Sequence, residues 1–94
     1  MNKEHLFKKI ITLIKKHGVK KVAIFGSYAR DEEKSKSDID ILVEFSERKS
    51  LLEHVKIERE LSEAVGIKVD LLTEKAISPY LIDRIRKEMK VIYQ

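Results

Sequence analysis

At 94 residues, the chain is long enough for one domain with a modest core and too short to enclose a deep pocket with a second domain. Aromatic residues make up only 6% and Cys is absent, which excludes a disulfide scaffold and leaves few platforms for stacking nucleic-acid bases. The net charge of +4 is mildly basic, and the lysine pairs that produce it lie mainly on a predicted helix, so we expect a solvated helix face and disfavour nucleic-acid binding.

The sequence has no signal peptide, lipidation motif or apolar run long enough to cross a membrane. Together with the absence of Cys, this predicts a cytoplasmic protein that does not associate with membranes. We expect residues 1–94 to form a single domain, because no linker or low-complexity segment interrupts them.

The first predicted element is an amphipathic helix over residues 3–17, in which apolar residues recur at helical spacing. Asn2 can cap its start, and Gly18 can end it in the left-handed conformation. The β-branched run that follows, Val19 to Phe25, predicts a strand.

Two further strands are predicted over residues 38–45 and 66–73, separated by a helix over residues 51–65. Ser50 and Glu53 form a capping box at the start of this helix, in which each side chain accepts a hydrogen bond from the other residue's backbone N–H. Gly66 is expected to end the helix.

The last predicted helix begins with Ser78 as its N-cap and Pro79 at its first position. We expect its apolar side chains to be buried, namely Leu81, Ile82, Ile85 and Met89. The resulting order, α-β-α-β-α-β-α, predicts an α/β (α+β) fold with a small three-stranded mixed sheet flanked by helices.

Two carboxylates interrupt the second strand. Because side chains alternate along a strand, Asp38 and Asp40 point to one face and Ile39 and Ile41 to the other. If the second and third strands are neighbours, Asp70 joins the two aspartates. Three like charges so close together need neutralising, and Mg²⁺ bound through oxygen ligands is the usual means.

The turn after the first strand has features suited to binding phosphate. Gly26 allows the backbone to approach a ligand closely, and Ser27 offers a hydroxyl beside free backbone N–H groups. Ten residues separate this Gly-Ser pair from the Asp-x-Asp of residues 38–40. The combination fits phosphoryl or nucleotidyl transfer; the alternative is that the aspartates only cap the ends of strands.

The stretch GSYARDEEKSKSDIDILVEF, residues 26–45, resembles the signature of the DNA polymerase β-like nucleotidyltransferase superfamily. More narrowly, it resembles the minimal nucleotidyltransferases (MNT proteins), which are often the antitoxin partners of HEPN-domain toxins. The resemblance covers nearly the whole chain and implies the nucleotidyltransferase fold.

The resemblance also implies roles for individual residues. Gly26 and Ser27 would hold the β- and γ-phosphates of ATP, and Arg30 could contact phosphate as well. The metal ligands for two Mg²⁺ ions would be Asp38, Asp40 and Asp70, with Asp70 also helping to activate the attacking hydroxyl.

Asp31 departs from the family pattern, in which a small residue, usually Gly, is common at this position. It is expected to place a negative charge near the phosphates and to alter the loop geometry.

The implied function is Mg²⁺-dependent transfer of AMP from ATP to a hydroxyl, expected to be a tyrosine, of a partner HEPN-type toxin. The chain would then be a protein adenylyltransferase that releases pyrophosphate and acts as the antitoxin of a type VII-like toxin-antitoxin pair, in a hetero-oligomer with the toxin. Two alternatives are an antitoxin that acts by binding alone and a nucleotidyltransferase for small molecules, which the lack of an acceptor domain disfavours.

The tyrosines have structural explanations. Tyr28 is expected to pack under the Gly-Ser turn, with stacking on a base as the alternative. Tyr80 and Tyr93 are expected to pack at the edge of the core, with a partner interface as the alternative.

Overall fold

A four-stranded mixed sheet with the strand order β3-β2-β1-β4 forms the centre of the fold. The computed structural model describes residues 2–94. Its strands are β1 (Val19–Phe25), β2 (Ile39–Phe45), β3 (Val69–Leu72) and β4 (Lys90–Tyr93). β1 pairs antiparallel with both β2 and β4, whereas β2 and β3 run parallel.

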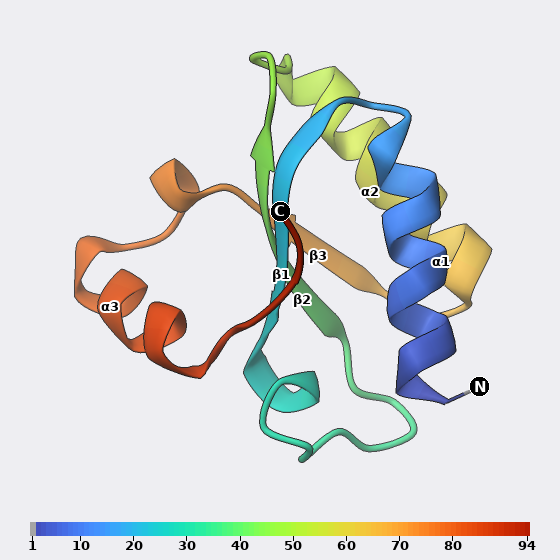
Figure 1. The fold of residues 1–94 in the computed structure, drawn as a ribbon, viewed down its shortest axis with the longest axis vertical. Helices are drawn as coiled ribbons and strands as arrows, with labels where there is room; N and C mark the ends of the chain where they lie inside the picture. The colour runs from blue at the N-terminus through green and yellow to red at the C-terminus, as the bar shows by residue number, and fades with distance from the viewer. Residues whose placement is uncertain (1) are drawn as a thin grey trace.

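Three helices cover the two faces of this sheet unequally (Figure 1). α1 (Lys3–Lys15) and α2 (Leu51–Val65) pack side by side on one face, and α3 (Pro79–Glu88) lies on the other. Within residues 2–94, no helix is both long and apolar enough to cross a membrane.

The main core lies between the sheet and the pair α1 and α2. On β1 and β2, its completely buried side chains alternate with side chains of the other face, as the pleat requires. The completely buried residues of this core, from strands and helices together, are Ile10, Ile14, Val22, Ile24, Ile39, Ile41 and Leu61. The predicted placement of Ile39 and Ile41 on the face opposite the aspartates is therefore confirmed.

The layer under α3 is much smaller. It consists of Ala23, Phe25, Leu42 and Ile85, and Ile85 is the one buried residue of α3. The expectation that four apolar residues of this helix are buried is therefore wrong: the Leu81 side chain is 49% exposed, and Ile82 and Met89 are only half-buried.

The predicted N-caps of the three helices and the predicted end of α2 are confirmed. The Asn2 side chain accepts from the N–H of His5, and Ser50 and Glu53 form the reciprocal capping box. Gly66 ends α2 in the left-handed conformation with φ of +71°. Ser78 caps α3 directly before Pro79. Because these caps satisfy otherwise unpaired backbone groups, they fix the ends of the helices at which they lie.

Gly18 does not end the first helix directly. α1 stops at Lys15 with Lys16 as its cap, and Gly18, at φ of +76°, forms the turn into β1.

The sheet has one strand more than predicted, although the α/β (α+β) class is confirmed. Residues 90–93 pair with β1, where Val22 lies opposite Tyr93 and Ala23 opposite Val91. This pairing covers an edge of β1 that would otherwise expose unsatisfied backbone groups. The second strand also begins one residue later than predicted, at Ile39.

Tyr28 is buried at 7% exposure and packs in the main core, as predicted. Tyr93 packs at its edge, also as predicted. Tyr80 does not, because its side chain is 93% exposed on α3.

Because the main core is thicker than the layer under α3, truncating an isoleucine should lower the free energy of unfolding by different amounts in the two layers. Ile41→Ala opens a cavity in the main core and should lower the free energy of unfolding by roughly 3–5 kcal/mol. Ile85→Ala should cost nearer 2 kcal/mol, because its thin layer can close around the gap. Urea denaturation of both variants measures the difference, and an equal or larger cost for Ile85→Ala would contradict the two-layer description.

Candidate active site

Three aspartates meet on the sheet face that α3 only partly covers. In the parallel pairing of β2 with β3, Asp40 lies directly opposite Asp70. Asp38 precedes Asp40 by two residues and therefore shares its face. All three are half-buried. The structure thus brings together the carboxylates that the sequence predicted would converge.

The turn that follows β1 lies directly against one of these carboxylates. Phe25, the last residue of β1, pairs with Asp40, so Gly26 emerges beside the Asp40 side chain. A Cβ atom added to Gly26 would clash with the Asp40 carboxylate, and the φ of Gly26 is +72°. Both facts favour glycine, because another residue would be strained at this φ and would displace the Asp40 carboxylate.

The Gly-Ser turn continues as a short 3-10 helix, Gly26–Tyr28. The Gly26 carbonyl accepts from the N–H groups of Ala29 and Arg30, at 3.1 and 3.2 Å, and buried Tyr28 anchors the turn to the core. Ser27 is half-buried at the start of this helix. The predicted phosphate-binding turn and acidic residues are therefore adjacent in space.

The charges at this site are not balanced. Burial raises the pKa of Asp40, and the negative charges of Asp70 and Asp38 raise it further, while the Arg30 guanidinium opposes them. A raised carboxyl pKa means that ionised Asp40 is destabilised by its surroundings. The site therefore favours anything that brings positive charge to Asp40.

Lys68 supplies part of the positive charge. Its Nζ lies 3.9 Å from an Asp38 oxygen and 3.9 Å from an Asp70 oxygen. Among the described residues, no three His, Cys, Asp or Glu side chains are already spaced to hold a metal ion. The aspartates are thus neighbours, but their side chains are arranged partly around an ammonium group.

Arg30, expected to contact phosphate, is held by carboxylates in this structure. Its Nε donates to Glu32 at 2.7 Å, and its Nη1 donates to Glu88 at 3.2 Å. These partners raise the pKa of Arg30, first through the hydrogen bond to Glu32. The Arg30 guanidinium lies near Asp40. A phosphate that binds to Arg30 must compete with Glu32 and Glu88 for it.

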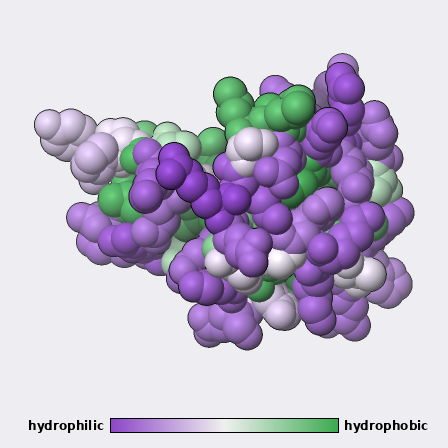
Figure 2. All heavy atoms as spheres, turned by 90° about the horizontal axis from the view of Figure 1, so that it is seen from above, coloured by the Kyte–Doolittle hydropathy of each residue, from purple (hydrophilic) through white to green (hydrophobic). Residues whose placement is uncertain are grey.

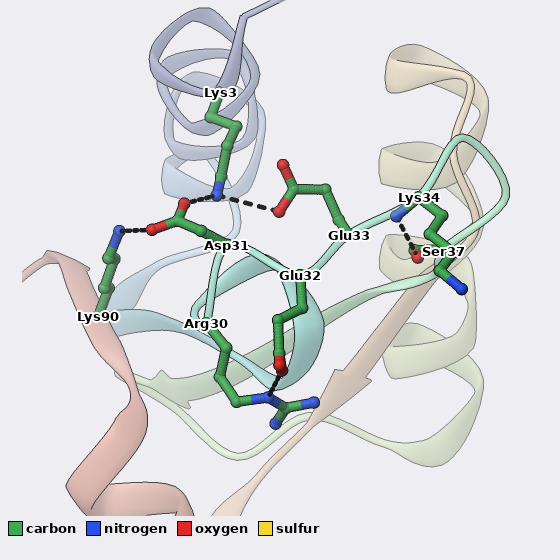
Figure 3. A network of polar contacts seen from close by, with 8 residues as sticks. All are labelled: Lys3, Arg30, Asp31, Glu32, Glu33, Lys34, Ser37 and Lys90. Atoms are coloured by element: carbon green, nitrogen blue, oxygen red, sulfur yellow. Dashed lines mark hydrogen bonds and ion pairs between the residues drawn. The ribbon is translucent and has the colours of Figure 1, made fainter.

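Asp31 lies on the opposite side of the loop from the Arg30 guanidinium (Figure 3). Its carboxylate pairs with Lys3 and, at 3.9 Å, with Lys90, and the hydrogen bond from Lys3 lowers the Asp31 pKa. Its φ of +57° lies in the left-handed region, which accounts for the preference for a small residue there. The expected negative charge is therefore neutralised, and Asp31 ties the loop to α1 and β4.

The residues present suit a divalent cation. The donor set consists of carboxylate oxygens, the ligands that Mg²⁺ prefers, and Gly26 leaves Asp40 uncovered by a neighbouring side chain. Burial, and then the charges of Asp70 and Asp38, raise the Asp40 pKa, and a bound cation would stabilise the ionised carboxylate against both.

The carboxylate face is open rather than enclosed. A hollow of about 750 Å³ lies at the other end of β2, where Phe45, Leu51 and His54 line it, and none of the three aspartates does. That end of the molecule, viewed from above, is largely hydrophilic with separate apolar patches (Figure 2). The open carboxylate face at the start of β2 suits a macromolecular acceptor better than a small molecule that needs enclosure.

Sequence reasoning missed two charged neighbours of the site, Lys68 and Glu88. For Lys68 a signal was present: it precedes Asp70 by two residues and so shares its face once the strand is recognised. For Glu88 there was none, because its contact with Arg30 joins residues 58 positions apart.

Comparison with known proteins agrees with this geometry. Residues 7–92 match the family described as "Nucleotidyltransferase domain". A protein of Methanocaldococcus jannaschii that is named as a candidate protein adenylyltransferase is 56% identical over 88 residues, which cover 94% of this chain and 95% of the relative.

Solved structures share the fold. A toxin-antitoxin crystal structure with AMP-PNP superposes with a TM-score of 0.83 at 25% identity, covering 93% of this chain and 72% of the other. An MNT antitoxin in complex with a tri-AMPylated Shewanella oneidensis HEPN toxin superposes with a TM-score of 0.77, covering 96% of this chain and 71% of the other. At 23% identity, the second likeness shows the fold alone.

The family match spans nearly the entire chain and includes the Gly-Ser turn and all three aspartates. The chain therefore belongs to the nucleotidyltransferase domain family.

Proposed function

We propose that this nucleotidyltransferase transfers AMP from ATP to a hydroxyl of a partner HEPN-type toxin and acts as its antitoxin. The observation that carries the proposal is the meeting of Asp38, Asp40 and Asp70 beside the Gly26 turn on an open face. The names of the relatives point the same way: one is a candidate protein adenylyltransferase, and another was crystallised as a toxin-antitoxin complex with an ATP analogue.

In the proposed mechanism, Gly26 and Ser27 bind the β- and γ-phosphates through backbone N–H groups and the serine hydroxyl. Asp38, Asp40 and Asp70 would hold two Mg²⁺ ions. When bound, these ions neutralise phosphate charge and lower the pKa of the acceptor hydroxyl.

The transfer itself exchanges one bond for another. The acceptor oxygen attacks the α-phosphorus, the bond from that phosphorus to the bridging oxygen breaks, and pyrophosphate leaves. Asp70 is suited to receive the hydroxyl proton, because its side chain is 37% exposed on the edge strand β3 and so can be reached by an incoming protein. The tyrosine as acceptor follows from the family resemblance.

A second candidate function is inhibition of the toxin by binding alone. Apolar side chains exposed at the start of α2 favour it, since Leu51 is 80% and Leu52 65% exposed, and such groups mark contact surfaces when they cluster. Binding and transfer can operate together, and a transfer experiment separates them.

The first prediction concerns the free protein. Asp40→Asn removes a carboxylate that its neighbours destabilise, so the metal-free variant should unfold at the same or a higher urea concentration than the wild type at pH 7. Because the Asp40 pKa is higher in the folded state, the wild type gains stability as the pH falls through that raised pKa towards the ordinary value of 3.8. The difference in unfolding urea concentration between the variant and the wild type should therefore shrink as the pH falls over that range.

Urea denaturation at several pH values measures this difference. A variant that fails to fold would identify Asp40 as a structural residue and remove the basis of the proposed site.

The second prediction concerns transfer. With Mg²⁺ and ATP, the chain should add one or more AMP units to a HEPN-type toxin that co-purifies with it from its host, as detected by intact mass spectrometry. Asp38→Asn with Asp40→Asn should lower the rate at least about a hundredfold, because the ligands for phosphate-neutralising cations are lost.

Asp83→Asn provides the control for a carboxylate lost outside the site, because the Asp83 side chain lies on α3 and is 81% exposed. It removes one negative charge, whereas the double variant removes two. The Asp83→Asn variant should transfer AMP at the wild-type rate. A stable complex in which the toxin stays unmodified would instead establish inhibition by binding.

A further inference from the structure

We infer that Lys68 is an internal counter-ion of the carboxylate site, which a divalent cation must displace in order to bind. The inference rests on the proposed function, because it concerns the cation site that transfer requires. Lys68 lies outside the Gly-Ser and Asp-x-Asp motif, and removing its charge is expected to tighten the binding of a divalent cation.

Backbone pairing fixes the position of Lys68. The Lys68 carbonyl accepts from the N–H of Ile39 at 2.9 Å, and Val69 then lies opposite Ile39 in the parallel register. One step earlier along both strands, Lys68 therefore lies beside Asp38. Because alternate residues share a face, Lys68 also points to the same side as Asp70.

Four charges thus form two adjacent rows on one face of the sheet. Asp40 and Asp70 oppose each other with like charges, whereas Asp38 and Lys68 oppose each other with unlike charges. The Lys68 Nζ is equally far, at 3.9 Å, from one oxygen of Asp38 and one of Asp70. It therefore bridges two of the three carboxylates and leaves Asp40 without its help.

This bridge is compatible with displacement. The Lys68 side chain is 70% exposed, so its ammonium can return to water at small cost. A cation bound by Asp38, Asp40 and Asp70 would lie within a few ångströms of the ammonium and would repel it. The lysine thus stabilises the site when no cation is bound and weakens cation binding by the same interaction, as linkage requires.

The test measures Mn²⁺ binding without nucleotide, by electron paramagnetic resonance of the free ion. Lys68→Met keeps the length of the side chain but removes its charge, and it should bind Mn²⁺ roughly 3- to 10-fold more tightly than the wild type, as expected for losing two exposed ion pairs. Lys68→Arg restores the charge and should bind close to the wild-type affinity.

Lys20→Met is the matched control for net charge. Lys20 is exposed near the start of β1, at the end of the sheet away from the site, and forms no ion pair among residues 2–94. Its substitution should change Mn²⁺ affinity by less than about twofold, because the charges are distant and screened.

The outcomes separate this inference from the proposed function. If the wild type binds Mn²⁺ and Lys68→Met binds equally or more weakly, the counter-ion role is overturned and the cation site stands. If Lys20→Met tightens binding as much as Lys68→Met, the effect is one of net charge and the inference is likewise overturned. If neither the wild type nor Lys68→Met binds Mn²⁺ at millimolar concentration, both the cation site and the counter-ion role of Lys68 are overturned.

Discussion

The close approach of the Asp40 carboxylate to Gly26 is the constraint on which the site depends. Gly26 has a φ of +72° and leaves open the space that the Asp40 side chain occupies. The antiparallel pairing of Phe25 with Asp40 holds this contact in register. The Gly-Ser turn and the acidic strand, which are separated in sequence by a charged loop, thereby meet at one point.

This arrangement destabilises the site, and the rest of the fold compensates. Ionised Asp40 is disfavoured by burial and by two neighbouring aspartates. On the opposite face of the same strand, Ile39 and Ile41 are completely buried against α1 and α2. Each such side chain contributes roughly 1.5–3 kcal/mol by burial, enough to hold β2 in place despite the repulsion on its other face. A strand with one apolar and one acidic face can therefore carry the chemistry and the core together.

Most of the fold, and the composition of the site, could be predicted from the sequence because the signals are local. The Ser50 capping box, Gly66 and Pro79 mark the boundaries of two helices within a few residues, and the structure places them as predicted. The family resemblance rests on the spacing of Gly26-Ser27 from Asp38, and the match over residues 7–92 confirms it.

The remaining features depend on contacts between distant residues. β4 has only four residues and is identified by its pairing with β1, so its sequence alone does not predict it. The neutralisation of Asp31 requires Lys3 and Lys90, which lie near the two ends of the chain. The exposure of Tyr80 follows from how α3 is oriented on the sheet, which periodicity within the helix does not determine.

The thin layer under α3 leaves the carboxylates accessible to the proposed protein acceptor. α3 contacts the sheet mainly through Ile85, while Leu81 remains largely exposed. A thicker layer on this face would bury Asp40 further and raise its pKa more, which would oppose both ionisation and access. Because this face is uncovered, the aspartates stay half-solvated. A second protein surface would therefore be needed to exclude water from the reacting groups. The incomplete second layer and the proposed protein acceptor are therefore consistent with each other, because the acceptor itself can exclude water from the open face.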